Sequence, residues 1–325
     1  MSLDKTTKFW KIVLRSMDES ASLKEATIKT EIELAKKDPT TKQVLDAIYL
    51  DEDRAASFER FFSSGEFKTI REQVLRRTEG NLNASICEVG AGPGFLAVAL
   101  ARSGFTNVCM LEPNGEWHTG TGFIGPLAEA HGVRIWNDLS AWYESDKVYD
   151  YIITKACVHH FTNVSKVAAE IACKLEDGGE WLMFDEFFAN TTKDFYLALR
   201  DHSHVIKYGQ YEWPYAAGMY VDLMRLVGFT LIDVVPNRYK NNYISRNITG
   251  TVRLSSPVTF ITNILLRAKI TTLFFRLERL LGDMFQLDGR LRFFTRPQLL
   301  VFLRRSAILP KVHHSDAKVI LKETV

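Results

Sequence analysis

The sequence has little of what marks a secreted, metal-bound or nucleic-acid-binding protein. It has only four cysteines, which lie in separate apolar segments without metal-ligand spacing: Cys87, Cys109, Cys157 and Cys173. This pattern predicts reduced core residues of a cytosolic protein rather than a disulfide framework. The formal net charge of +2 is too small to predict nucleic acid as a partner.

Long apolar runs are also missing. No stretch of about 18 uninterrupted apolar residues is present, as a membrane-spanning helix would need, and no basic-then-apolar leader opens the sequence. With 46% apolar and 25% charged residues, the composition is that of an ordinary globular protein. We therefore expect a cytoplasmic protein without a transmembrane segment. Its 325 residues predict two domains, or one domain with additions.

One stretch organises the rest of the chain. Residues 86–94 predict a short buried strand and a glycine-rich turn, followed by an apolar helix over Phe95–Arg102. Gly90, Gly92 and Gly94 alternate in the turn, and because they lack a Cβ they allow a tight bend and a close approach to a ligand. The free N–H groups at the start of the helix point back toward such a ligand.

Glu88 is the unusual residue of this stretch. A parallel strand buried on both faces should be apolar, so a carboxylate there needs a partner, and a cationic ligand group would be one. The pattern acid-x-Gly-x-Gly-x-Gly resembles motif I of the class I S-adenosylmethionine-dependent methyltransferases. The resemblance implies S-adenosylmethionine as cofactor, with Glu88 near its amino-acid end. The loop 90–94, including Ala91, would pass beneath its methionine and ribose.

A dinucleotide-binding loop is the alternative at this motif. The frame that starts at Gly90 lacks the third glycine of that fingerprint, although a frame that starts at Gly92 is permissible. The glycine spacing therefore leaves a nicotinamide-dependent oxidoreductase open, while Glu88 favours the methyltransferase. A third interpretation is a non-catalytic protein that uses the fold to bind cofactor or assemble a complex. The presence of Glu88 and Glu112 argues against it.

From residue 84 onward, strands and helices alternate, which predicts an α/β protein with a parallel sheet covered on both faces. The strands are expected at 85–89, 107–111, 133–136, 149–154, 180–184 and 229–235, and the helices between them at 122–131, 165–175 and 215–227. With the resemblance, the expected fold is a doubly wound, mostly parallel, seven-stranded sheet.

The two ends of the chain lie outside the motif resemblance. Residues 1–80 predict helices, either an extension packed on the core or a lid over cofactor and substrate, and the methyltransferase core is expected at 81–236. Sheets of this class finish with a hairpin, so a last core strand is predicted at Ala317–Leu321, within 315–325. The closer candidate, 247–254, is more polar and is interrupted by a glycine.

Residues 237–314 would then form an insertion between the last two strands. Their apolar residues predict helices that need to be covered, by the N-terminal helices or by a second subunit in a homodimer, and they could cover the substrate as a lid. The interleaved basic residues leave a membrane-surface helix as an alternative.

Polar residues at the carboxyl ends of the strands are the candidates for chemistry, because ligands of open α/β sheets bind beyond that edge. Glu112 closes the second strand, at about the distance from the glycine loop where an acid accepts hydrogen bonds from ribose. The resemblance implies that Asp138 contacts the adenine amino group and that Leu139 packs on the ring. Asp138 is also a good N-cap for the segment after it. Lys155 opens the loop that flanks the cofactor in this class.

That loop continues to His159 and His160, and a histidine pair is frequent at this place in small-molecule methyltransferases, which the loop resembles. One histidine is a candidate general base and the other would be structural, and the sequence does not separate them. Asp185 and Glu186 follow the fifth strand and could orient a substrate hydroxyl or amine, or act as the base. We expect no metal, because these residues have no diagnostic ligand spacing.

The acceptor is the least defined part of the prediction. No Asn-Pro-Pro-Tyr segment follows the fourth strand, which disfavours methylation of DNA or of an amide nitrogen. Residues 201–215, rich in histidine and aromatic side chains, are the expected wall of the substrate site. We therefore predict methyl transfer to an oxygen, nitrogen or carbon atom of a small molecule.

Overall fold

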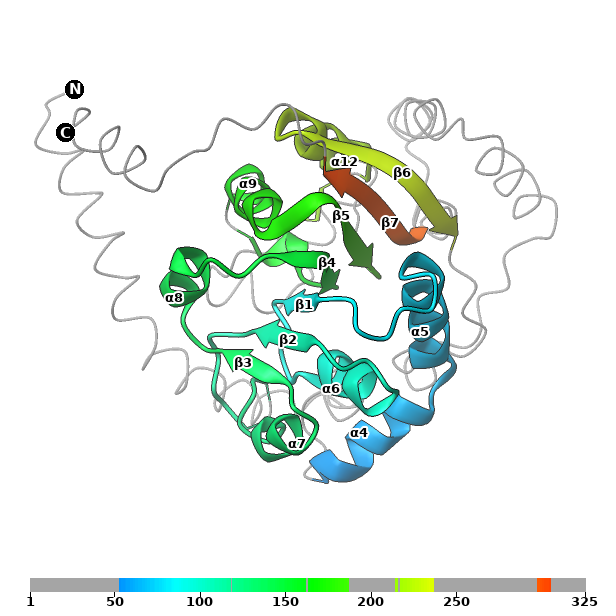
Figure 1. Cartoon of the computed structure of the whole chain (residues 1–325), viewed down its shortest axis with the longest axis vertical. Helices are drawn as coiled ribbons and strands as arrows, with labels where there is room; N and C mark the ends of the chain where they lie inside the picture. Colours follow the sequence, from blue (N-terminus) through cyan, green and yellow to red (C-terminus); the bar gives the residue numbers. More distant parts are fainter. Residues whose placement is uncertain are drawn as a thin grey trace, which may run out of the picture.

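The computed structural model of the chain describes residues 53–117, 119–161, 163–186, 214–215, 217–236 and 297–304. Its centre is a seven-stranded sheet in the order β3-β2-β1-β4-β5-β7-β6 (Figure 1). The neighbouring strands are parallel except at β7, which is antiparallel to β5 and to β6. The strands are β1 (Ile86–Val89), β2 (Val108–Leu111), β3 (Arg134–Trp136), β4 (Tyr149–Lys155), β5 (Leu175–Phe184), β6 (Phe229–Pro236) and β7 (Pro297–Arg304). This architecture confirms the predicted fold.

Helices cover both faces of the sheet (Figure 1). One face packs against α4 (Arg54–Ser63), α5 (Gly65–Arg77), α6 (Phe95–Arg102) and α7 (Gly125–Ala130). The other packs against α8 (Leu139–Glu144), α9 (Val164–Lys174) and α12 (Ala217–Leu226). Successive strand residues point to opposite faces, so Ile86 belongs to the first core and Cys87 to the second. No helix in the described ranges is both long enough and apolar enough to cross a membrane.

The seventh strand corrects one prediction. Pro297–Arg304 fills the position between β5 and β6, where Leu300 pairs with Met183 on one side and with Val234 on the other. The prediction that Ala317–Leu321 is this strand is therefore wrong, and so is an insertion that runs to residue 314. Residues 299–302 are buried on both faces. A short, continuously apolar run of this kind cannot be distinguished from a buried helix by its periodicity.

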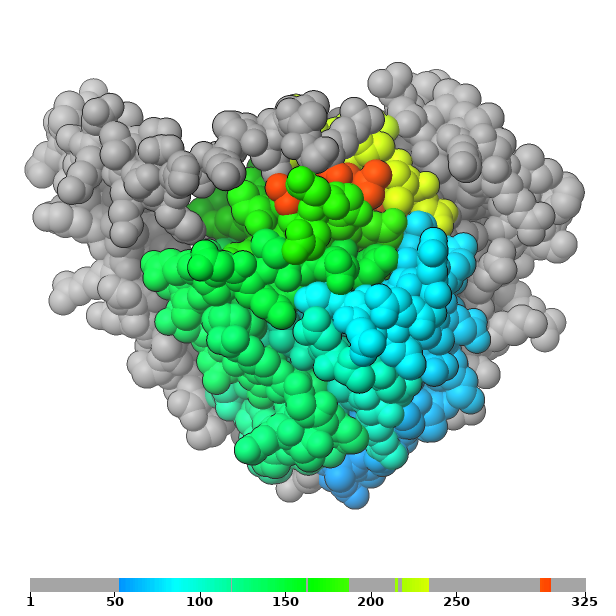
Figure 2. Space-filling model, in the orientation of Figure 1, coloured from blue at the N-terminus to red at the C-terminus, as the bar shows by residue number. Residues whose placement is uncertain are grey.

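The helices α4 and α5 are part of the core. Phe58, Phe61 and Phe67 are buried, and the rings of Phe58 and Phe95 meet edge to face with centroids 5.5 Å apart. Figure 2 shows the blue residues of α4 and α5 directly against the cyan residues that follow them. The earlier helices predicted before residue 51, the segments 247–254 and Ala317–Leu321, and most of 201–215 lie outside the described residues.

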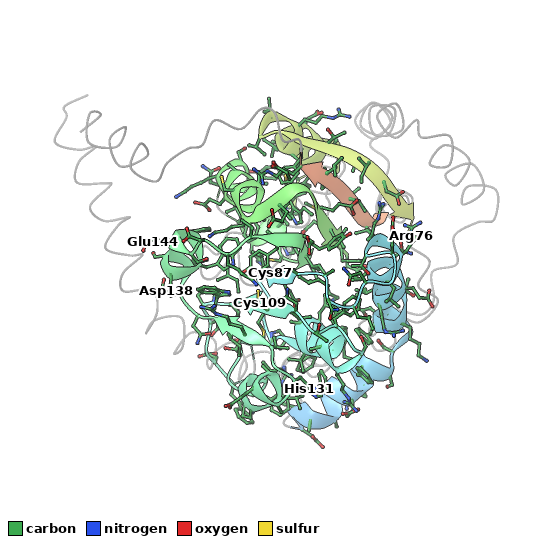
Figure 3. All side chains as sticks on the ribbon, in the orientation of Figure 1. Arg76, Cys87, Cys109, His131, Asp138 and Glu144 are labelled. Atoms are coloured by element: carbon green, nitrogen blue, oxygen red, sulfur yellow. The ribbon has the colours of Figure 1, made fainter. Side chains whose placement is uncertain are left out.

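The four cysteines are all free thiols. Cys87 and Cys109 are neighbours in register on the adjacent strands β1 and β2 (Figure 3), and Cys157 is also buried. Cys173 is exposed, so the prediction of a core position is wrong for this residue.

Candidate active site

The three glycines after β1 all have positive φ angles, but each is needed for a different reason. A Cβ at Gly90 would lie 2.0 Å from Sγ of Cys157, and one at Gly94 would lie 2.8 Å from side-chain atoms of Met110 and Ile124. Packing within the protein therefore requires glycine at both positions. A Cβ at Gly92 would meet nothing closer than the carbonyl oxygen of Thr119, at 3.8 Å. An added Cβ at Gly92 would therefore make only an ordinary van der Waals contact, so packing leaves room at this position for the close approach of a ligand.

Glu112, directly after β2, is joined to this loop. Its Oε2 accepts a hydrogen bond from the N–H of Gly92 at 2.7 Å, and its Oε1 accepts one from the N–H of Asn114 at 2.9 Å. The carboxylate therefore lies against the open side of the glycine loop. A contact of this backbone and this acid with the ribose of the cofactor, which the sequence suggested, remains a prediction.

Glu88 is 3% exposed, and its Oε2 accepts a hydrogen bond from the N–H of Ala97, in the first turn of α6, at 2.8 Å. Gly94, the N-cap of α6, has no side chain to satisfy that turn, so Glu88 takes over this role. Burial raises the pKa of Glu88 to about 8, and the charge of Glu112 adds to the increase, while the Ala97 N–H and Lys155 oppose it. Glu88 thus has a protein partner that the sequence did not indicate.

The carboxyl ends of β4 and β5 share an uncommon backbone conformation. Ala156 and Asp185, the residues directly after these strands, have φ angles of 47° and 48°. Residues other than glycine rarely adopt this left-handed conformation, and such positions gather at functional sites. The N–H of Ala156 donates to the carbonyl of Phe184 at 3.0 Å, which holds the two strand ends together.

Lys155, the last residue of β4, is paired within the protein. Its Nζ lies 2.9 Å from Oε1 of Glu66 on α5, and the Glu66 side chain is 2% exposed. Burial disfavours the charged form of Lys155, but the carboxylates of Glu66, Asp185 and Glu88 outweigh it and keep the pKa above its ordinary value. The ammonium therefore joins α5 to the edge of the sheet where the glycine loop lies.

The loop after β4 is organised by one acid, Glu186. Its carboxylate, 3% exposed, accepts hydrogen bonds from the N–H groups of Val158 at 2.8 Å, Cys157 at 3.2 Å and His159 at 3.3 Å. It also contacts Nδ1 of the His159 ring. The ring of His159 is buried and lies 4.1 Å, centroid to centroid, from that of His160, which is exposed. The structure thus distinguishes the two histidines, which the sequence could not.

Asp138 serves as the N-cap that the sequence allowed. Its Oδ1 accepts from the N–H groups of Ser140 at 2.8 Å and Ala141 at 3.4 Å, at the start of α8 (Figure 3). Leu139 beside it is 43% exposed. A contact of these two residues with adenine remains a prediction. No group of three or more metal-binding side chains occurs among the described residues.

The fold and this edge define a doubly wound α/β protein whose glycine loop follows β1 and whose acids lie near the end of β1 and after β2 and β5. A family model for the methyltransferase domain matches residues 62–234, which is more than half of the chain. The chain belongs to this methyltransferase-domain family. No protein with curated annotation matches it.

Two solved structures illustrate the structural similarity. The YcgJ protein from Bacillus subtilis is 17% identical with a TM-score of 0.44, over 73% of this chain and 98% of that one. Magnesium protoporphyrin IX methyltransferase from Synechocystis PCC 6803, solved with bound SAH, is 11% identical with a TM-score of 0.41, over 78% of this chain and 94% of that one. At these identities, neither assigns a substrate to this chain.

Family membership decides between the interpretations left open by the glycine spacing. The chain is a methyltransferase that depends on S-adenosylmethionine, as predicted, and a nicotinamide-dependent oxidoreductase is not favoured.

Proposed function

We propose that this methyltransferase acts on a small-molecule acceptor and that His159 is the general base that removes a proton from the acceptor. The single observation that carries the proposal is the contact of Glu186 with both the ring and the backbone of His159. When bound, S-adenosylmethionine supplies a methyl group made electrophilic by its sulfonium. The chain's own part is then to hold the acceptor, to exclude water and to take up the proton.

The geometry of Glu186 supports this assignment. A carboxylate at Nδ1 makes that nitrogen the donor, so Nε2 of the neutral ring is the basic atom. The same carboxylate also accepts from the N–H groups of Cys157 and Val158, so one acid holds both the ring and the loop that carries it. His160 is exposed and its ring packs against that of His159, which suits a structural role.

The cofactor residues are proposed on similar grounds. The backbone at Gly92 and the carboxylate of Glu112 would hold the adenosine part. Gly90 and Gly94 would shape the loop, and Ala91 would contribute backbone. Lys155 would act indirectly, by positioning the end of β4.

Two further proposals concern the whole protein. The buried thiols Cys87, Cys109 and Cys157 support a reducing compartment, the cytoplasm. A homodimer formed through residues 237–296 is compatible with their apolar composition, although these residues lie outside the described ranges.

The test of the base compares His159→Ala with His160→Ala. The acceptor is first identified by incubating the protein with methyl-labelled S-adenosylmethionine and fractionated small-molecule extracts. His159→Ala is expected to lower turnover by at least tenfold, since a general base contributes about 10²–10⁴-fold. Calorimetry should show nearly unchanged affinity for S-adenosylhomocysteine.

His160→Ala is the matched control, because it removes the neighbouring ring and should leave turnover within about threefold of wild type, far from the loss expected of a base. Glu186→Gln should also lower turnover and shift the pH profile of kcat, since it changes which ring nitrogen carries the proton. Wild-type turnover in His159→Ala would refute the assignment.

A further inference from the structure

Glu88 has an environment that does not suit a carboxylate when no ligand is bound. It is 3% exposed, at the end of the strand that leads into the glycine loop. One of its oxygens accepts from the N–H of Ala97 at 2.8 Å. A single peptide N–H stabilises a buried carboxylate much less than a full set of donors or a cation would.

The charged groups around Glu88 do not make up the difference. Lys155 on β4 is the cation that acts on it, but the Nζ of Lys155 is already 2.9 Å from the carboxylate of Glu66 and also feels that of Asp185. Glu112, directly after β2, acts on Glu88 with a charge of the same sign. Among the described residues, the charges that act on Glu88 are therefore one lysine, which is already paired with Glu66, and one carboxylate of like sign.

The consequence is that Glu88 keeps a proton near neutral pH. Burial is the largest cause of the elevated pKa, about 8, and the repulsion from Glu112 acts in the same direction. In the neutral form, the carboxyl still accepts the hydrogen bond from Ala97 and satisfies the first turn of α6. Only the charge is missing.

We propose that Glu88 gives up this proton when S-adenosylmethionine binds, so that cofactor binding and proton release are coupled. The inference rests on the function proposed above, in which the cofactor lies along the glycine loop. The cofactor carries a sulfonium and an ammonium, and either would bring a positive charge to the buried carboxyl group of Glu88. The Glu88 carboxylic acid becomes a carboxylate, and its proton passes to the solvent.

The test is calorimetric titration of the full-length protein with S-adenosylmethionine at pH 7, in phosphate and in Tris buffer. The two buffers take up protons with different enthalpies, so the difference between the observed heats gives the number of protons released. Wild type should release close to one proton per site, and affinity should increase up to about tenfold between pH 6 and 7.

Glu88→Gln is the matched variant, because glutamine resembles the neutral acid and retains the acceptor for Ala97. It should bind more weakly, release no proton and show little dependence on pH. Glu129→Gln, on the exposed side of α7, removes a carboxylate away from the site and should behave as wild type. Titration with 5′-methylthioadenosine, which has no positive charge, should release no proton from wild type.

A second measurement uses the wild-type protein alone. Infrared difference spectra of wild type should show the carbonyl band of a protonated carboxylic acid that disappears when the cofactor binds. Binding without proton release, or without loss of this band, would overturn the inference and leave the proposed function standing. Absence of any binding by folded protein would instead overturn the proposed function.

The stability of the unliganded protein tests the same proton. The folded-state pKa of Glu88 lies above its ordinary value of 4.5, so the stability that the proton contributes is present below pH 4.5 and is lost as pH rises toward about 8. The free energy of unfolding of wild type, relative to Glu88→Gln, should therefore decrease across this window. A constant difference would contradict a protonated Glu88.

Discussion

At the scale of single residues, the glycine loop separates two positions needed for packing from one position that we propose for ligand binding. Gly92→Val should abolish binding of S-adenosylmethionine, because the side chain would occupy the room along the loop where we propose that the cofactor lies. Gly80→Val is the control, since Gly80 also has a positive φ and nothing within 4 Å of an added Cβ, but it lies at the end of α5. Calorimetry compares the two variants, and equal affinities would contradict the role of Gly92.

Gly90→Ala gives the complementary result. An added Cβ would overlap Sγ of Cys157, so this change should lower the melting temperature far more than Gly92→Ala does. The sequence pattern marks all three glycines alike. It could not show that two of them are fixed by neighbours from other elements.

The acids of the site were predictable only in part. Their places at the ends of strands followed from the sequence, because the alternation of strands and helices puts Glu88, Glu112 and Glu186 on one edge. Their partners did not follow, since Ala97 and His159 depend on how α6 and the loop after β4 pack. For Glu186, the available signal was an acid pair directly after the fifth strand, and only the structure shows which acid of the pair meets the histidine.

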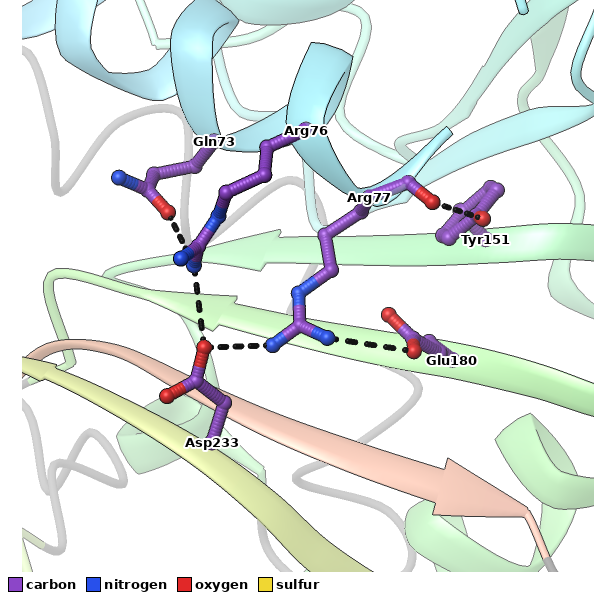
Figure 4. Close-up of polar contacts among 6 residues, drawn as sticks. All are labelled: Gln73, Arg76, Arg77, Tyr151, Glu180 and Asp233. Carbon is purple, nitrogen blue, oxygen red and sulfur yellow. Dashed lines mark hydrogen bonds and ion pairs between the residues drawn. The ribbon is translucent and has the colours of Figure 1, made fainter. Parts of the chain in front are cut away.

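At the scale of elements, α5 is attached to the sheet at both ends. Glu66 in its first turn pairs with Lys155, and Arg77 at its other end contacts Asp233 on β6 at 2.6 Å and Glu180 on β5 at 3.5 Å (Figure 4). The hydroxyl of Tyr151 on β4 donates to the carbonyl of Arg77 at 2.7 Å. α5 therefore holds three strands of the sheet together.

Arg77→Met should destabilise the protein by about 2 kcal/mol, since it leaves two carboxylates without their shared donor. Arg76→Met is a closely matched control, because Arg76 also contacts Asp233 but its side chain is 56% exposed, against 17% for Arg77. The control should change stability by no more than about 0.5 kcal/mol. Urea unfolding gives the free energy of unfolding of both variants. Equal losses of stability would show that the more buried contacts of Arg77 contribute no more than the exposed contact of Arg76.

The elements that sequence reasoning located well are those with both a periodic pattern and clear boundaries. The apolar helix Phe95–Arg102 is found with the predicted limits, between a glycine and a serine. β7 was placed wrongly because its residues are apolar without alternation, which follows from its internal position in the sheet. Pairing with β5 and β6 decides the conformation of β7. Because these strands are far from β7 along the chain, the local sequence of β7 does not indicate the pairing.

At the scale of the whole molecule, the seven strands are complete at residue 304. A chain that ends after Pro310 should therefore remain soluble and bind S-adenosylmethionine. A chain that ends at residue 296 lacks β7, exposes the edge of β5 and leaves β6 without its described neighbour, so it should be insoluble. Soluble yield and calorimetry distinguish the two. The reverse outcome would show that β7 is dispensable and that the last residues are not.

The late position of β7 also constrains how the chain is made. A ribosome adds residues from the N-terminus, so β1 to β5 and later β6 emerge long before Pro297–Arg304 is available. Until then, β5 presents an open edge, and β6 has no strand of the described sheet to join. The nascent protein must therefore keep an unfinished sheet while the residues between β6 and β7 are synthesised, which is the interval in which it most needs a chaperone.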